Sequence, residues 1–277
     1  MGESKSRKQA ILTSFPRCYY CGKSGSQTVD HVPARAFFRG KVGPEGFEYG
    51  ACFACNSMTR YVEQAVSFYI TLLDHGYADG DHAEREGKMI GLWNNFPELL
   101  PLANVSANEK RRAFEHHDPA FRISETFAEE PILRLPDAMT WAFETFAFKL
   151  TASLYQRHFG SPLEDASLVR SDWFNFTTKK RRDIIEGANK NLPGLDVGRR
   201  VNTSIGDQFI YRYGANVPAK LFAFVAQLRK SALVVGVVGP QRGGDGYSDL
   251  KTAGEIRVET ISRLNTNPKG WIHSSIT

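Results

Sequence analysis

The clearest pattern of hydrophobic positions lies between residues 137 and 160. Aromatic and aliphatic side chains recur there on nearly every face of a predicted helix. A helix that is apolar all round is typically buried in a core. Asp137 is placed to cap this helix and Gly160 to end it. We therefore expect a central core helix at residues 137–160; the alternative is an aromatic surface on which nucleic-acid bases stack.

A second helix is predicted from apolar residues that recur at three- and four-residue steps over residues 61–73. The helical pattern begins at Asn56, and Gly76 is suited to stop it. The neighbouring segments have no such pattern. Residues 1–13 are expected to be a flexible basic lead-in. Residues 77–118 are polar and mixed, and their histidines are expected to be solvated.

The last third of the chain changes to the β-branched and aromatic runs of strands. Residues 239–246 are rich in glycine but lack the Lys-Ser/Thr of a phosphate-binding loop, so they are interpreted as a turn. The predicted strands cover residues 199–204, 208–213, 221–228, 232–238 and 255–264, and the third and fourth form a hairpin.

Composition narrows the class of protein. The chain has 277 residues, of which 42% are hydrophobic, as in an ordinary globular protein. No apolar run approaches the roughly 20 residues that a membrane span needs. The apolar patch near the N-terminus is too short for a signal peptide. We therefore expect a cytoplasmic protein.

The positive charge is concentrated at the N-terminal end. Residues 1–60 hold nine Lys and Arg but four Asp and Glu, so they account for the whole formal net charge of +5. This asymmetry favours a polyanion as the partner of that region. A basic segment that merely keeps the protein in solution is the alternative.

All four cysteines fall into two Cys-x-x-Cys pairs, Cys18 with Cys21 and Cys52 with Cys55. Each pair can present two thiolates to one ion, and two pairs make a tetrahedral zinc site. Disulfides are the weaker interpretation, because a chain of this size can build a hydrophobic core without them. We therefore predict a structural Zn²⁺ held by four thiolates.

Further polar residues stand at fixed places around the cysteine pairs. Asp30 and His31 follow a short β-like run, Pro33 comes two residues later, and Asn56 directly follows the last cysteine. The pattern C-x-x-C … D-H … C-x-x-C-N resembles the zinc-stabilised form of the HNH endonuclease family. The resemblance covers roughly residues 14–75.

This resemblance implies a ββα-metal module, in which two strands and a helix frame the active site. It implies that His31 is the general base for hydrolysis of DNA, since a neutral imidazole accepts a proton from water. It also implies that Asp30 and Asn56 bind a catalytic Mg²⁺ or Mn²⁺ through oxygen atoms. The family's middle Asn is missing, which leaves a backbone carbonyl or Glu48 to orient His31.

Together these features predict an α+β protein of two parts. Residues 1–76 form the HNH zinc module with its extended helix. Residues 77–277 form a helical middle and an antiparallel β-rich end, with a recognition or regulatory role and a protein or ligand as a further partner. Proteins with this layout often serve in antiviral defence or mobile elements, which is an analogy at the level of the family.

Basic residues supply the expected contacts with DNA. Those nearest the motif are Arg35, Arg39 and Lys41, which are expected to bind phosphates. A second basic cluster at the start of a predicted short helix, residues 178–190, is either an outer phosphate rim or a solvated face. Its members are Lys179, Lys180, Arg181 and Arg182.

Two other functions fit the same residues. The first is a zinc-knuckle module without catalysis that binds nucleic acid or a protein, which the missing Asn favours. The second is an effector that is held inactive by an unknown partner or small ligand, which residues 120–277 bind.

Overall fold

The computed structural model describes residues 2–23, 25–74, 81–100, 135–175, 186–187, 190, 195–229, 231–240 and 250–265. Its helices are α1 (Gly2–Ser14), α2 (Phe53–Leu72), α3 (Asp81–Asn95), α6 (Asp137–Phe159) and α8 (Ala253–Asn265), with short 3-10 turns η1 (Arg35–Phe37), η2 (Arg39–Lys41), η3 (Pro97–Leu99) and η5 (Gly206–Gln208). Its strands are β1 (Thr28–His31), β2 (Glu48–Ala51), β3 (Leu168–Asn175), β4 (Arg199–Asn202), β5 (Phe209–Asn216), β6 (Leu221–Leu228), β7 (Ala232–Gly239) and β8 (Lys251–Thr252).

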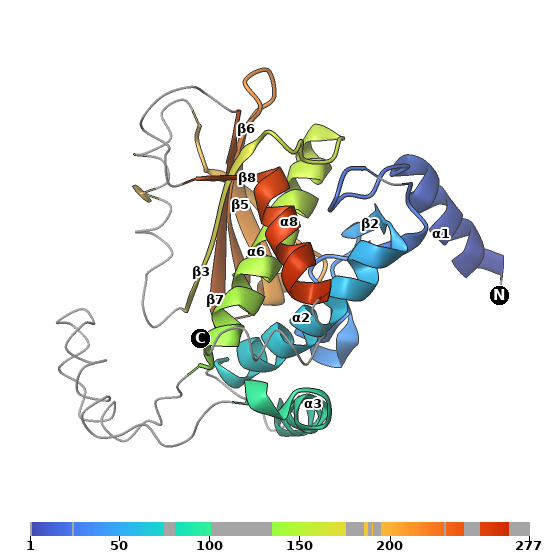
Figure 1. Ribbon diagram of the computed structural model, residues 1–277, viewed down its shortest axis with the longest axis vertical. Helices are drawn as coiled ribbons and strands as arrows, with labels where there is room; N and C mark the ends of the chain where they lie inside the picture. The colour runs from blue at the N-terminus through green and yellow to red at the C-terminus, as the bar shows by residue number, and fades with distance from the viewer. Residues whose placement is uncertain are drawn as a thin grey trace.

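Helix α6 lies between a large sheet and the N-terminal unit (Figure 1). The sheet has six antiparallel strands in the order β4-β5-β6-β7-β3-β8. On the other side of α6, helix α2 packs against it and carries the two-stranded hairpin β1-β2. The mixture of helices and antiparallel sheets confirms the α+β class.

The predicted core helix is confirmed as α6. Phe146 and Leu150 are fully buried, and Phe146 stacks on Phe37 at 4.6 Å between ring centroids. Gly160 ends the helix in a left-handed conformation with φ of 71°. Asp137 is the first helical residue and not the cap, which is Pro136 without a side-chain hydrogen bond.

Most strands of the large sheet are where the pattern predicted them, but β3 and the two-residue β8 were missed. Four predicted strands correspond to β4, β5, β6 and β7, and the β6-β7 hairpin is confirmed. Strand β3 pairs with β7 over eight residues, although no alternation predicted it. Three consecutive polar residues, Arg170, Ser171 and Asp172, interrupt its apolar pattern.

One hydrophobic core runs through both predicted parts of the chain. It includes Cys55 and Val66 of α2, Phe146 of α6 and Phe224 of β6. A smaller cluster that includes Val225 lies on the opposite face of the sheet. Packing therefore continues across the predicted boundary at residue 76.

The flexible lead-in was a wrong prediction, because residues 2–14 form helix α1. Tertiary contacts explain the difference. The guanidinium of Arg7 lies 2.6 Å from Glu48 Oε1 of β2, and Phe15, just after the helix, packs its ring against Tyr49. A polar sequence shows no amphipathic stripe, so these partners cannot be read from it. Likewise, the polar residues 81–95 form α3.

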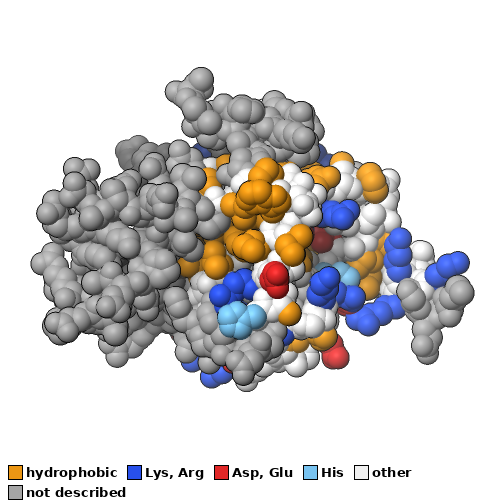
Figure 2. Space-filling model, turned by 90° about the horizontal axis from the view of Figure 1, so that it is seen from below, with side chains coloured by type: hydrophobic (Ala, Val, Ile, Leu, Met, Phe, Trp, Pro, Cys, Tyr) orange, Lys and Arg blue, Asp and Glu red, His pale blue; other side chains and the backbone are white. Residues whose placement is uncertain are grey.

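The surface mixes charged and hydrophobic side chains. In Figure 2, Lys and Arg side chains lie scattered among hydrophobic and uncharged ones on the coloured part of the face, and several are on the side of α1. The exposed hydrophobic residues of the described surface include Met89, Ile90 and Trp93 of α3. The coloured part of this face therefore shows no continuous basic field.

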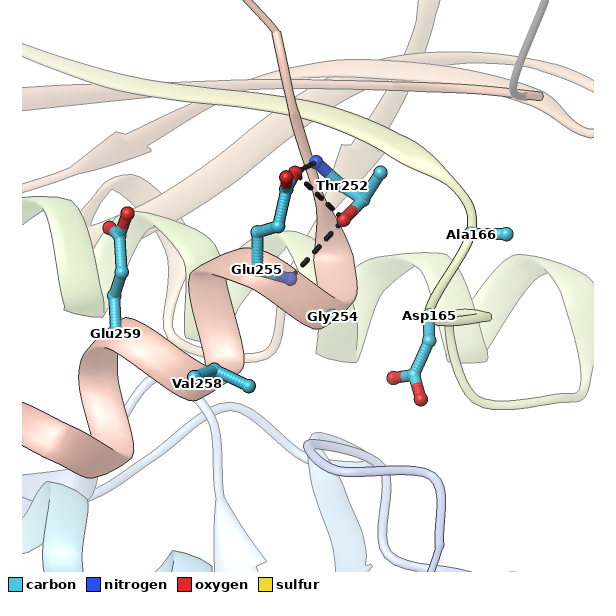
Figure 3. Close-up of a pocket in the computed structure, with 7 residues that line it drawn as sticks. All are labelled: Asp165, Ala166, Thr252, Gly254, Glu255, Val258 and Glu259. Carbon is cyan, nitrogen blue, oxygen red and sulfur yellow. Dashed lines mark hydrogen bonds between the residues drawn. The ribbon is translucent and has the colours of Figure 1, made fainter.

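The strand predicted at residues 255–264 was wrong, because these residues lie in helix α8. A reciprocal cap starts that helix (Figure 3). The backbone N–H of Thr252 donates to Glu255 Oε2 at 2.7 Å, and the Glu255 N–H donates to Thr252 Oγ1 at 3.2 Å. The Thr-x-x-Glu spacing of a capping box was thus the signal that outweighed the strand-like composition.

Candidate functional site

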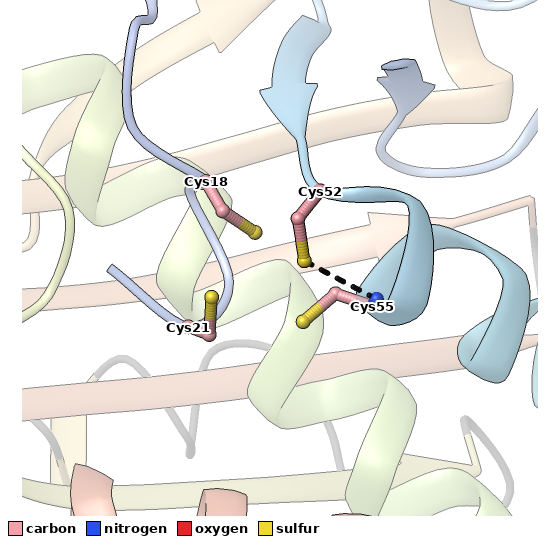
Figure 4. A group of neighbouring side chains, drawn as sticks. All are labelled: Cys18, Cys21, Cys52 and Cys55. Carbon is pink, nitrogen blue, oxygen red and sulfur yellow. Dashed lines mark hydrogen bonds between the residues drawn. The ribbon is translucent and has the colours of Figure 1, made fainter. Parts of the chain in front are cut away.

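The four cysteines come together, as predicted. Cys18 and Cys21 lie on the segment before β1, Cys52 directly follows β2, and Cys55 is in the first turn of α2 (Figure 4). Their Sγ atoms all lie within 4.8 Å of one another. Two segments about thirty residues apart in the sequence therefore present four sulfur atoms to one centre.

Local backbone geometry positions each pair. In the first knuckle, the Gly22 N–H donates to the Cys18 carbonyl at 2.8 Å, and Gly22 has φ of 70°, which glycine adopts without strain. The Arg17 side chain donates to the Gly22 carbonyl at 2.6 Å. In the second knuckle, Cys52 is the N-cap of α2, and its Sγ accepts from the Cys55 N–H at 3.4 Å. A helix start thus fixes the second pair.

The cysteine cluster fits a structural zinc ion. Four ligands at a Zn–S distance of about 2.3 Å place their sulfur atoms about 3.8 Å apart, within the spread found here. Hydrogen bonding to Cys21 raises the pKa of Cys18 to about 11, and hydrogen bonds with Cys18 and Cys21 raise that of Cys55. Crowded thiols resist ionisation unless a cation compensates them, which is what zinc supplies.

His31 lies at the end of β1 opposite Glu48 of β2. Its Nε2 is 3.5 Å from Glu48 Oε1, too poorly placed for a hydrogen bond, and has no hydrogen-bond partner among the described residues. Burial and, next, the charge of Arg35 lower the pKa of His31 below 6.5, although Glu48 and Asp30 act in the opposite sense. The imidazole is therefore neutral at pH 7. Glu48, one of the two predicted orienting groups, faces His31 across the hairpin.

Asp30 is turned to the opposite face of the strand from His31, because neighbouring strand residues alternate. Its side chain is buried against α6. There its Oδ2 lies 2.9 Å from Nζ of Lys149 and accepts a hydrogen bond from the Tyr19 hydroxyl at 2.8 Å. The carboxylate that the resemblance assigns to a divalent ion therefore already has a protein cation as its partner.

Asn56 lies in the first turn of α2 and reaches back to the hairpin. Its Nδ2 donates to Thr28 Oγ1 at 3.0 Å, and Thr28 is on the same face of β1 as Asp30. Asn56 thus lies on the side of the hairpin away from His31. The three predicted site residues are neighbours around one strand, but they do not converge on one described pocket.

The predicted phosphate contacts divide into two sets. Arg35, Arg39 and Lys41 are exposed on η1 and η2, shortly after His31. The guanidinium of Arg39 also lies 3.8 Å from Asp74 Oδ2. The second basic cluster, residues 179–182, lies outside the described residues. Of its predicted helix, residues 178–190, the structure describes residues 186, 187 and 190, which are helical.

Sequence reasoning missed a group of buried polar residues beside the site. Lys149 of α6 contacts Asp30 together with Thr59 and Glu63 of α2. Two signals were present in the sequence. Lys149 stands alone in the most apolar stretch of the core helix, and Glu63 follows Cys55 by two helical turns.

A surface hollow beside α8 is a weaker candidate (Figure 3). It is lined by Asp165, Thr252, Glu255, Val258 and Glu259. Its acidic side chains already have partners: Arg257 for Asp165, Thr252 for Glu255 and Lys251 for Glu259. The hollow therefore offers no uncompensated charge to a ligand.

Comparison with known proteins gives no relative. No family model matches the chain, and neither the curated proteins nor the solved structures contain a significant match. Among the described helices, none combines the length and apolarity required to cross a membrane.

Proposed function

We propose that the chain is a zinc-anchored endonuclease of the HNH type that hydrolyses phosphodiester bonds in DNA. The observation that carries the proposal is the hairpin-helix unit: the cysteine cluster ties its strands to its helix, and His31 stands beside Glu48 at the strand end. The motif residues that suggested the family lie on this one unit.

His31 has the properties of a general base. A partly buried, neutral imidazole can take a proton from a water molecule that attacks phosphorus. The carboxylate of Glu48 then lies close enough to stabilise the imidazolium that forms. The exposed Arg35, Arg39 and Lys41 are suited to hold the DNA backbone nearby.

The catalytic Mg²⁺ or Mn²⁺ that the resemblance implies does not fit the side chains as they lie. Asp30 Oδ2 already has Lys149 and Tyr19 as partners, and Asn56 is anchored through its Nδ2, which donates to Thr28 Oγ1 on the side of the hairpin away from His31. We therefore assign no step of the reaction to an ion at these residues.

The same observation favours a second candidate function, a zinc-knuckle module that binds DNA or a protein without cleaving it. A motif carboxylate engaged in a buried ion pair is what a structural role requires. This candidate predicts DNA binding that weakens with salt, without cleavage.

Nicking of supercoiled plasmid tests the proposal. We expect the zinc-loaded chain to nick the plasmid and His31→Ala to slow nicking at least about 100-fold, because a general base contributes that much. Zinc content, thermal midpoint and DNA affinity should stay unchanged. Parallel reactions with Mg²⁺, with Mn²⁺ and with neither give the ion dependence.

His82→Ala on helix α3 is the matched control, since it removes an exposed histidine away from the hairpin. Equal nicking by the wild type and His31→Ala would refute the proposed base. Salt-dependent DNA binding with no nicking under any condition would leave the binding module as the function.

A further inference from the structure

Lys149 of α6 occupies a cation site formed by oxygen atoms of β1 and α2. Its Nζ lies 2.9 Å from Asp30 Oδ2 of β1 and 2.6 Å from Glu63 Oε1 of α2. It also donates to Thr59 Oγ1, one turn earlier on α2, at 2.9 Å. These contacts join β1, α2 and α6 around one positive charge.

The site is closed around the ammonium group. An ammonium has three N–H donors, and three acceptors surround this one. The side chain of Lys149 is only 1% exposed, so neither water nor a phosphate reaches Nζ. Lys149 therefore takes no direct part in any reaction at His31.

The same oxygen atoms are of the type that hard divalent ions prefer. Two carboxylates and a hydroxyl converge, with the Tyr19 hydroxyl on the shared oxygen of Asp30. The distances of 2.6–2.9 Å are those of hydrogen bonds, whereas Mg²⁺ binds oxygen at about 2.1 Å. With Lys149 in place the cluster is thus spaced for an ammonium, and a metal would need the ammonium removed and the oxygen atoms drawn closer together.

We propose that Lys149 is the resident cation of this cluster and that it excludes divalent ions from Asp30. Two buried carboxylates need positive charge nearby, and the chain supplies it from its own core helix. If the proposed nuclease function holds, its reaction proceeds without a metal at Asp30. The exclusion itself does not depend on cleavage.

Manganese binding to the zinc-loaded full chain tests the exclusion without an activity assay. Free Mn²⁺ is followed by electron paramagnetic resonance during titration of the wild type and Asp30→Asn. We expect the two binding curves to coincide. A Mn²⁺ site present in the wild type and lost in Asp30→Asn would overturn the proposal, and this comparison decides it even if other variants fail to fold.

Removing the ammonium gives the complementary test. In Lys149→Met, we expect one additional Mn²⁺ site that binds at least tenfold tighter than any in the wild type, and a thermal midpoint that rises with Mn²⁺. The double variant Lys149→Met/Asp30→Asn should lose both effects. Lys220→Met, which breaks an exposed ion pair, should behave as the wild type. A folded Lys149→Met with no new site would contradict the proposal.

Discussion

Two polar clusters on helix α2 obtain their cations in different ways. The cysteine cluster presents four sulfur atoms, and its cation must come from solution. The oxygen cluster of Asp30, Glu63 and Thr59 receives its cation from Lys149 of the same chain. Cys55, Thr59 and Glu63 recur at four-residue spacing, so one face of α2 serves both clusters.

The difference shows how each cluster is tied to folding. The cysteines lie within residues 18–55, so zinc can organise the N-terminal unit locally. The oxygen cluster forms only when α6 docks on α2 and the hairpin, because Lys149 is distant in sequence from its partners. If zinc binds there as predicted, the first cluster depends on available zinc, whereas the second depends on assembly of the whole core.

Loss of zinc should have the largest effect. Cys18→Ser should reduce the zinc content from one ion per chain to none, and the thermal midpoint should fall by about 10 °C or more, since metal binding supplies folding energy. Elemental analysis and thermal unfolding measure the two. Lys23→Ser, an exposed residue after the first knuckle, is the control. Purified, reduced wild-type protein without zinc would show that the cluster has another role.

Loss of the cation at the oxygen cluster should have the next largest effect. Lys149→Met should lower the free energy of unfolding by about 3–5 kcal/mol, because it leaves buried carboxylates uncompensated. Lys220→Met removes an ion pair of 2.7 Å whose side chains are 52% and 60% exposed, and it should cost under about 1 kcal/mol. Denaturant unfolding measures both. Equal losses would mean that burial does not distinguish the two pairs.

The two clusters also differ in how far the sequence predicts them. Two Cys-x-x-Cys pairs disclose the first, because its ligands follow a local spacing rule. The second depends on which helix packs against β1, and no spacing between Asp30 and Lys149 encodes that contact. The sequence therefore predicted the residues around Asp30 but not its partner.

The same limit explains the outcomes for the fold. Helix α6 and the β6-β7 hairpin were predictable, since buried elements carry continuous apolar patterns. Helix α1 and strand β3 could not be predicted, because tertiary contacts stabilise them. Arg7 of α1 pairs with Glu48, and the polar run in β3 pairs with β7. The capping residues Thr252 and Glu255 encode the start of helix α8 locally, but the strand-like composition of residues 255–264 led to the wrong prediction of a strand.

Core truncation on α6 sharpens the comparison, because it disturbs the docking helix without touching either cluster's ligands. Phe146→Ala should cost about 3–5 kcal/mol, since this fully buried ring stacks on Phe37. Trp141 is only partly buried, so Trp141→Ala should lower the free energy of unfolding by less. Zinc content should stay at one ion in both. If both substitutions are tolerated and Phe146 proves accessible to solvent, the alternative of an aromatic surface for base stacking would be supported.

The smallest expected effect concerns Thr59, a member of the oxygen cluster that also bonds the backbone of Cys55 in the cysteine cluster. Its hydroxyl donates to the Cys55 carbonyl at 3.0 Å and accepts from Lys149 at 2.9 Å. Thr59→Val keeps the branched shape but leaves one N–H of Lys149 without its acceptor, which should cost about 1–3 kcal/mol in denaturant unfolding. Thr59→Ser keeps the hydroxyl and should lower the free energy of unfolding by less than Thr59→Val does.

Zinc content distinguishes the two contacts of Thr59. Its hydroxyl bonds the backbone carbonyl of Cys55 and not the sulfur, so Thr59→Val should retain one zinc ion per chain. Loss of zinc together with stability would mean that the clusters form one cooperative unit. If Thr59→Ser proves more destabilising than Thr59→Val, the methyl group matters more than the hydroxyl, and hydrogen bonding to Lys149 is not what stabilises this face of α2.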